Sequence, residues 1–184
     1  MAGRASDPSG AWHPRRFDLS LGDGAGHGLV LYPTPQATRM GSGGGLFGSL
    51  RFDGGEDPAL AGRPAAWALI EVAVTVSPTD ERRFRAQADA RGDFRLSLWR
   101  LPPLPEGTSS YAASLTVRAD PTADPGISPD PGVLEPTRAE PPAGAPGEGS
   151  FGPSIPLSLV PGQLRRVESA GERVLLLRPG AAPP

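Results

Sequence analysis

The chain has 184 residues and contains neither cysteine nor lysine, so all 18 of its basic side chains are arginine. These absences exclude disulfide bonds, thiolate catalysis, cysteine-ligated zinc, Walker-type phosphate loops and Schiff-base chemistry. The formal net charge is -2, with charges of both signs mixed along the chain. Without a basic stripe to neutralise phosphates, we expect no nucleic-acid partner.

Glycine (25) and proline (24) together make 49 of the 184 residues, yet apolar residues gather into short alternating runs. This combination predicts a modest core with long irregular connections. The N-terminal residues lack the apolar centre of a signal peptide, and no apolar run is long enough to span a membrane. We therefore expect a protein made in the cytoplasm without a signal peptide and without membrane insertion.

Residues 1–45 are expected to form an N-terminal arm with one or two strands. Phe17, Leu19 and Leu21 alternate with polar residues, which is typical of a strand with one buried face. A second short run contains Leu29 and Leu31 and is closed by prolines, which are rare inside a sheet.

Residues 46–120 show the clearest strand pattern. Apolar residues alternate with polar ones over 46–52, 67–77, 84–88, 94–98 and 111–117. Helical periodicity is hard to find, and the frequent prolines would interrupt a helix. The pattern predicts an all-β fold, with the strands arranged as a β-sandwich.

The character of the chain changes over 121–153, where proline and glycine dominate and Asp-Pro steps recur. We expect a Pro/Gly-rich extended linker there, because such a segment is unsuited to a regular ladder. Over 154–184, alternation returns at Ile155, Leu157 and Leu159. Two later runs, 164–168 and 173–177, predict a C-terminal hairpin or arm, which either returns to the sandwich or docks on a neighbouring molecule.

A short loop between the runs at 84–88 and 94–98 carries a turn signature, which predicts that these two runs form a β-hairpin. Asp89 can cap the turn, Gly92 can adopt the strained backbone position and Phe94 can fill the core. Its Ala-Asp-x-x-Gly-x-Phe sequence is followed by Leu104-Pro105-Glu106-Gly107 and Tyr111.

Gly48-Ser49-Leu50 and the valine-rich run from Ile70 to Val76 both precede this turn. Together with them, the pattern resembles the carboxypeptidase regulatory-like domain, a small transthyretin-like β-sandwich. The resemblance covers about 75 of the 184 residues. It implies an accessory module that spaces domains or binds surfaces, with no catalysis and no cofactor. Stand-alone versions resemble small accessory proteins of phage tails and contractile injection systems, which is an analogy of fold.

Several motifs have a simpler structural explanation. Residues 43–48 match G-x-G-x-x-G, but a strand rather than a helix is expected after them, which favours a glycine connection over a dinucleotide site. Arg91-Gly92-Asp93 matches the integrin tripeptide and is explained by turn chemistry. The acidic stretch 53–57 and Asp23 lack the spacing of a calcium loop. His13 and His27 form no triad or zinc pattern with their neighbours in sequence.

Two features remain as candidates for partner binding. Arg82, Arg83 and Arg85 precede an apolar run; we favour a role in protecting a sheet edge, with contact to an acidic partner as the alternative. Trp99 lies opposite the apolar face of its strand and either contacts a partner or packs under a loop. Together with Trp12 and Trp67 it could also form a carbohydrate platform.

These observations favour a non-enzymatic structural subunit of a phage or phage-tail-like particle, docked to other protein subunits through its arms. A stand-alone β-sandwich that binds a glycan or protein ligand is the alternative. A third hypothesis is an enzyme whose site has no recognisable motif.

Overall fold

The computed structural model describes residues 2–18 and 28–180, and almost all of its regular structure is β-strand. The strands are β1 (Ala2–Ala5), β2 (Arg15–Asp18), β3 (Gly45–Phe52), β4 (Leu69–Ser77), β5 (Asp80–Gln87), β6 (Asp93–Ser97), β7 (Tyr111–Ala119), β8 (Glu135–Ala139), β9 (Ile155–Leu159), β10 (Leu164–Arg166) and β11 (Leu175–Pro179). Two 3-10 turns, η1 (Pro58–Leu60) and η2 (Pro131–Val133), accompany them. The all-β prediction is confirmed.

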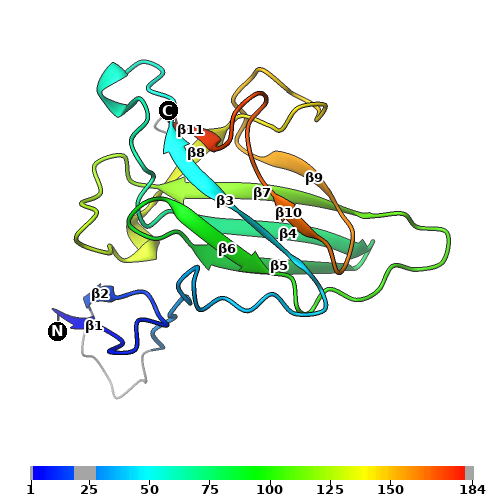
Figure 1. Cartoon of the computed structure of the whole chain (residues 1–184), viewed down its shortest axis with the longest axis horizontal. Coiled ribbons are helices and arrows are strands. Elements are labelled where there is room, and N and C mark those ends of the chain that lie inside the picture. The colour runs from blue at the N-terminus through cyan, green and yellow to red at the C-terminus, as the bar shows by residue number, and fades with distance from the viewer. Residues whose placement is uncertain (1, 19–27, 181–184) are drawn as a thin grey trace.

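Within the described residues, β1 and β2 form a small antiparallel sheet and the other nine strands form one curled sheet. Its main path runs β10-β3-β11-β8-β7-β4-β5, while β6 pairs with β3 and β9 pairs with β7. In Figure 1, β3 and β6 cross in front of β4, β5 and β7, and the β1–β2 ribbon lies apart from them. The curl therefore brings two parts of one sheet face to face around a common core.

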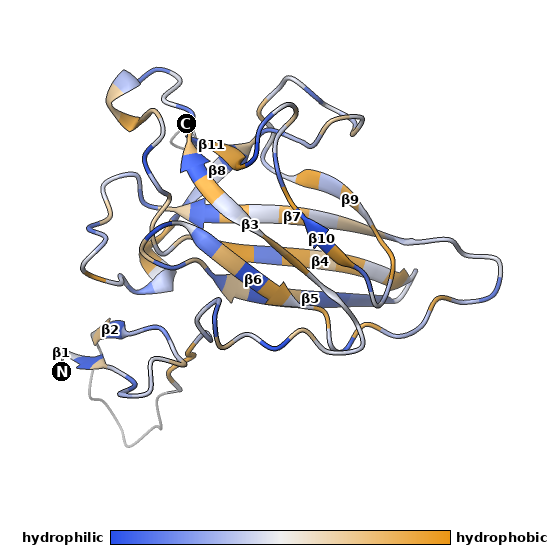
Figure 2. Ribbon diagram, in the orientation of Figure 1, coloured by the Kyte–Doolittle hydropathy of each residue, from blue (hydrophilic) through white to orange (hydrophobic). Residues whose placement is uncertain are grey.

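The central strand β4 explains this core. Ile70, Val72 and Val74 are fully buried and alternate with the more polar residues that point outward. Across the ladders, Val72 lies opposite Phe84 of β5 and Leu115 of β7. Figure 2 shows the resulting alternation of hydrophobic and hydrophilic residues along these strands. Because side chains alternate with a period of two, one face of each strand packs inward.

The segment 121–153 differs from the predicted linker, because it contains η2 and β8. Strand β8 pairs with β7 through Pro136 and with β11 through Thr137 to Ala139. The Thr137 hydroxyl donates to the Val117 carbonyl oxygen at 2.8 Å, and Leu134 is fully buried. A proline removes only its own N–H donor, so the neighbouring residues of a short strand can still form a ladder.

The predicted C-terminal hairpin is wrong. Strands β10 and β11 both run parallel to β3, with Leu164 beside Gly45 and Leu175 beside Leu50. Two strands that run in the same direction along one neighbour do not form a hairpin with each other. They are one interrupted strand, and the loop between them is held where the Ser169 hydroxyl donates to the Glu140 carbonyl oxygen and accepts from the Leu176 N–H. The apolar residues of β11, Leu175 and Leu177, therefore return to the core of the same chain.

The N-terminal arm matches its prediction only in part. Strand β2 contains Phe17, whereas Leu19 and Leu21 lie outside the described residues. The run at Leu29 and Leu31 is not a strand, and only an isolated bridge between Trp12 and Pro33 forms nearby. None of the described helical segments is both long and apolar enough to cross a membrane.

The buried C-terminal strand yields a first prediction. Replacing Leu177, which is 0% exposed, with alanine should lower the free energy of unfolding by about 2–5 kcal/mol, because a cavity replaces a packed side chain. Leu164→Ala is the matched control: Leu164 is 61% exposed, and its truncation should change stability by about 0.5 kcal/mol or less. Urea unfolding measures both. Equal effects of the two changes would contradict the integration of β11 into the core.

Candidate partner-binding surface

The residues expected to shape the turn lie together where β5 leads into β6. Asp89 Oδ1 accepts hydrogen bonds from the N–H groups of Arg91 at 2.8 Å and Asp93 at 3.0 Å. Gly92 has φ of +79°, and a Cβ at this position would lie 2.4 Å from the Leu50 carbonyl oxygen. Phe94 is 1% exposed. Both the backbone conformation and the close approach therefore require glycine at position 92.

The predicted hairpin at this turn is wrong, because the strands on either side of it are not paired with each other. Strand β5 pairs with β4, whereas β6 pairs with β3. The turn therefore carries the chain from the part of the curled sheet that contains β4 and β5 to the opposed part that contains β3 and β6. Alternation along the sequence alone does not reveal this crossing. The Arg91 side chain is 72% exposed, lying 3.7 Å from a carboxylate oxygen of Asp89 and 3.5 Å from one of Asp93.

Trp67, just before β4, has φ of +61°, a conformation that bulky side chains rarely adopt. Three hydrogen bonds hold it: its N–H donates to the Asp89 carbonyl oxygen at 3.2 Å, its indole N–H donates to the Asp124 carbonyl oxygen at 3.1 Å, and its carbonyl oxygen accepts from the Gln87 amide at 3.2 Å. It is 7% exposed. A strained residue persists only where its surroundings fix it, and here two distant segments, 87–89 and the loop at Asp124, do so.

His13 attaches the N-terminal arm to this tryptophan. The two rings meet edge to face with centroids 5.6 Å apart, and His13 Nε2 lies 3.2 Å from the Gln87 carbonyl oxygen. His13 is 4% exposed. Burial lowers the pKa of its imidazole below the ordinary value, although the Gln87 carbonyl and the Asp89 charge act in the opposite direction. The neutral imidazole is therefore the form that suits this contact.

A shallow hollow of about 540 Å³ lies where the arm meets the body. Trp12, His13, Trp67, Asp89 and Arg91 are among its lining residues. Trp12 is 45% exposed, which makes it the accessible aromatic side chain of the group. The hollow thus combines an aromatic surface with charged groups of both signs, a combination that can bind a polar ligand or a peptide segment.

The three arginines of the predicted basic cluster lie on β5, whose ladder partner is β4. Arg82 pairs with Asp80, and Arg83 pairs with both Glu71 and Glu81. Arg85 also pairs with Glu71. Burial alone would raise the pKa of Glu71, but Arg85 and Arg83 outweigh it and hold that pKa below its ordinary value. The cluster is therefore largely neutralised by carboxylates of its own sheet, and each exposed ion pair contributes little to stability.

Trp99 follows β6 and is 58% exposed. The Arg100 guanidinium carbon lies 4.2 Å from the centroid of its ring, a cation–π geometry. Trp99 is not among the residues that line the hollow of Trp12 and Trp67, so the three tryptophans do not form one platform. Its ring is nevertheless a large accessible apolar surface.

The remaining motifs have structural explanations. A Cβ at Gly43 would lie 1.9 Å from the Leu98 carbonyl oxygen, so the glycine run permits a close approach of two backbones. Asp53 forms an ion pair with Arg178, and Asp57 accepts from the Ala59 N–H at the start of η1. Asp23 and His27 lie outside the described residues. The described residues contain no cluster of side chains suited to holding a metal ion.

Sequence reasoning missed the residues that attach the arm. His13 and Gln87 surround Trp67, and Arg15 forms a 2.8 Å ion pair with Asp130, which lies 115 residues away. Such pairs have no signature in sequence spacing. Gln87 gave no signal in the sequence, because it occupies a polar position of the alternation and its burial appears only in the structure.

Comparison with protein-family models, with curated proteins and with solved structures finds no match for this chain. The resemblance to the carboxypeptidase regulatory-like domain therefore stays a prediction.

The buried imidazole yields a prediction of pH dependence. Because the pKa of His13 is lower in the docked arm than the ordinary 6.5, a released arm takes up a proton more readily, and docking should weaken as pH falls below about 6.5. Hydrogen exchange of the backbone amides of residues 11–13, 15 and 16, corrected for intrinsic rates, should therefore accelerate below that pH. His27→Gln is the matched control and should keep this response, while His13→Phe should lose it. Unchanged protection from pH 7 to 5 in the parent chain would contradict the anchoring role of His13.

Proposed function

We propose that the chain is a non-enzymatic structural subunit of a phage or phage-tail-like particle, as a tail, baseplate, cap or decoration component. In this role its N-terminal arm, residues 1–45, docks on neighbouring subunits. The observation that carries the proposal is the β1–β2 ribbon, whose ladder is separate from the main sheet. A two-stranded ribbon is marginally stable alone and gains stability when it packs on a further surface.

The exposed apolar residues of the arm support this role. Trp12 is 45% exposed, Val30 is 58% exposed and Leu31 is 37% exposed. Several large apolar side chains left exposed on one arm are a feature that suits contact with another protein. The arm contacts the body through His13 and the Arg15–Asp130 ion pair, which leaves these apolar residues accessible. The resemblance to accessory domains of phage-tail-like particles suggests the kind of assembly.

One observation favours the alternative, a stand-alone module that binds a glycan. The hollow at Trp12 and Trp67 offers an accessible aromatic ring beside Asp89 and Arg91. Sugars stack on such rings and hydrogen-bond to such charged groups. A monomeric chain that binds an oligosaccharide, with affinity lost in Trp12→Ala, would favour this alternative over the structural role.

The structural role is tested by comparing the free chain with the assembled one. In native lysate the chain should sediment with large particles, and amides 2–17 should exchange much more slowly within the particle than in the purified chain. Trp12→Ala should reduce incorporation because it removes an exposed apolar contact. Tyr32→Phe serves as the control, since it keeps the ring. A chain that sediments only as a small species, with equal exchange in both samples, would contradict the proposal.

A further inference from the structure

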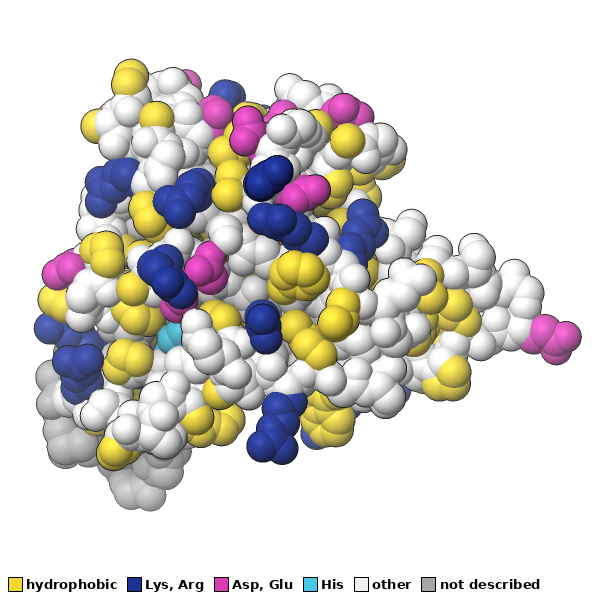
Figure 3. Space-filling view, viewed as in Figure 1, with side chains coloured by type: hydrophobic (Ala, Val, Ile, Leu, Met, Phe, Trp, Pro, Cys, Tyr) yellow, Lys and Arg dark blue, Asp and Glu magenta, His cyan; other side chains and the backbone are white. Residues whose placement is uncertain are grey.

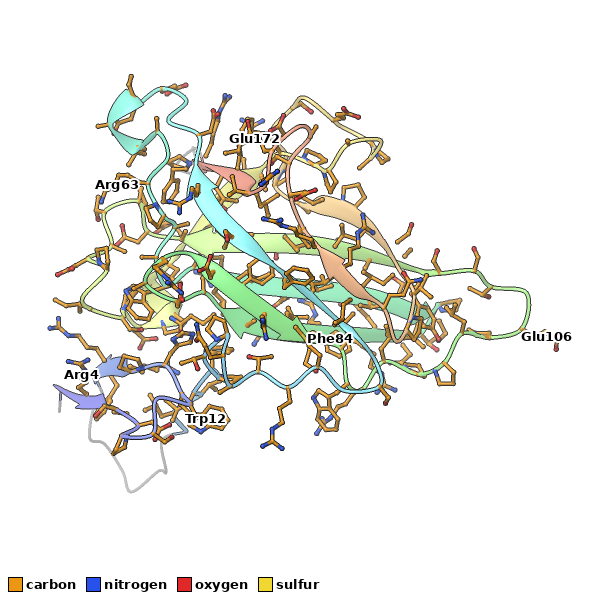
Figure 4. The ribbon with its side chains drawn as sticks, in the orientation of Figure 1. Arg4, Trp12, Arg63, Phe84, Glu106 and Glu172 are labelled. Carbon is orange, nitrogen blue, oxygen red and sulfur yellow. The ribbon has the colours of Figure 1, made fainter. Side chains whose placement is uncertain are left out.

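The connection between β6 and β7 (residues 98–110) projects from the body as a narrow finger, with Glu106 at its tip (Figures 3 and 4). Prolines at 102, 103 and 105 restrict its backbone. At its base the Tyr111 hydroxyl donates to the Pro103 carbonyl oxygen at 2.9 Å. At its tip the Thr108 N–H donates to the Pro105 carbonyl oxygen at 3.1 Å and closes a turn.

The finger therefore presents one carboxylate on a preorganised support. Glu106 is exposed, and it forms no ion pair with any described residue. A loop that is already ordered loses little conformational entropy on binding, so its contacts contribute more fully to affinity.

A hollow of about 410 Å³ lies near the other end of β7, on the outer face of the sheet. Its lining includes Thr116 and Arg118 of β7, Glu71 of β4, Arg85 of β5 and Arg15 of the arm. The finger precedes Tyr111, the first residue of β7, whereas Arg118 is next to its last residue. In Figure 1 the finger and the Ala119 end of β7 lie on opposite sides of the molecule.

Arginine charge prevails in this hollow. Arg15 is paired with Asp130, and Arg85 shares Glu71 with Arg83. Arg118 is exposed and forms no ion pair within the part of the chain that the structure describes. The Nε of Arg15 is buried without a hydrogen-bond partner among the described residues. A hollow with these groups attracts a carboxylate, since guanidinium groups match its geometry.

We propose that the finger of one copy inserts Glu106 into the arginine hollow of a second copy, next to Arg118. Tyr111 and Arg118 are separated by about 23 Å along β7, and the finger extends further beyond Tyr111, so one copy cannot make this contact with itself. Each copy has both a finger and a hollow, so the contact is either exchanged reciprocally in a two-fold dimer or repeated head-to-tail as a ring or filament. The proposal rests on the structural role above and identifies one neighbouring subunit as the chain itself.

Charge-reversal variants of the purified protein test the contact between copies. In sedimentation velocity at low ionic strength, the parent chain should associate reversibly as its concentration rises. Glu106→Arg and Arg118→Glu should each lower the association constant by about tenfold or more, because like charges then face each other. An equimolar mixture of the two variants should regain association, since every finger again meets a hollow of opposite charge. The chain that carries both changes should regain it as well.

Glu172→Arg is the matched control, since it makes the same change of charge at an exposed position outside the finger and the hollow, and it should associate like the parent. Recovery in the mixture also shows that both single variants are folded. A parent chain that stays monomeric at every concentration, or a mixture that fails to associate, would overturn the contact between copies. If that monomeric chain still entered particles through its arm, the structural role would survive.

Discussion

The architecture depends on the contacts that hold Trp67 in a positive-φ conformation. This residue joins three segments that are far apart in sequence: the arm at His13, the turn at Asp89 and the loop at Asp124. A tryptophan in this conformation is strained by about 1–3 kcal/mol, so these contacts must together offset that cost. The result is a rigid junction beneath a docked arm, and it places the exposed apolar residues of the arm beside the body rather than within its core.

Much of the main sheet could be predicted from the sequence because one face of each strand is buried. The alternation at Ile70, Val72 and Val74 directly reflects that burial, and the Asp89 to Phe94 turn follows from the φ that Gly92 alone tolerates. Strand partners were harder to predict. Alternation does not distinguish a hairpin from two parallel additions to β3, and proline content concealed β8, which needs only a short ladder.

The candidate surface was less predictable than the fold, since it consists of contacts distant in sequence. The arginines of β5 are conspicuous in the sequence, yet Glu71 and Asp80 neutralise much of their charge. Arg118 is inconspicuous in the sequence, and its significance depends on the hollow around it. A cluster of arginines in the sequence is therefore a poor indicator of a binding surface. Whether each arginine is available to bind depends on whether a carboxylate of the same chain pairs with it in the fold.

The anchoring of the arm at Trp67 is tested most directly by a double-mutant cycle on unfolding free energy. The cycle uses His13→Ala, Trp67→Leu and the chain with both changes. An edge-to-face ring pair contributes about 0.5–1.5 kcal/mol beyond its buried area. The doubly changed chain should therefore lose about 1 kcal/mol less unfolding free energy than the sum of the two single losses. Strictly additive losses would contradict the account, because they would show that His13 and Trp67 stabilise the protein independently.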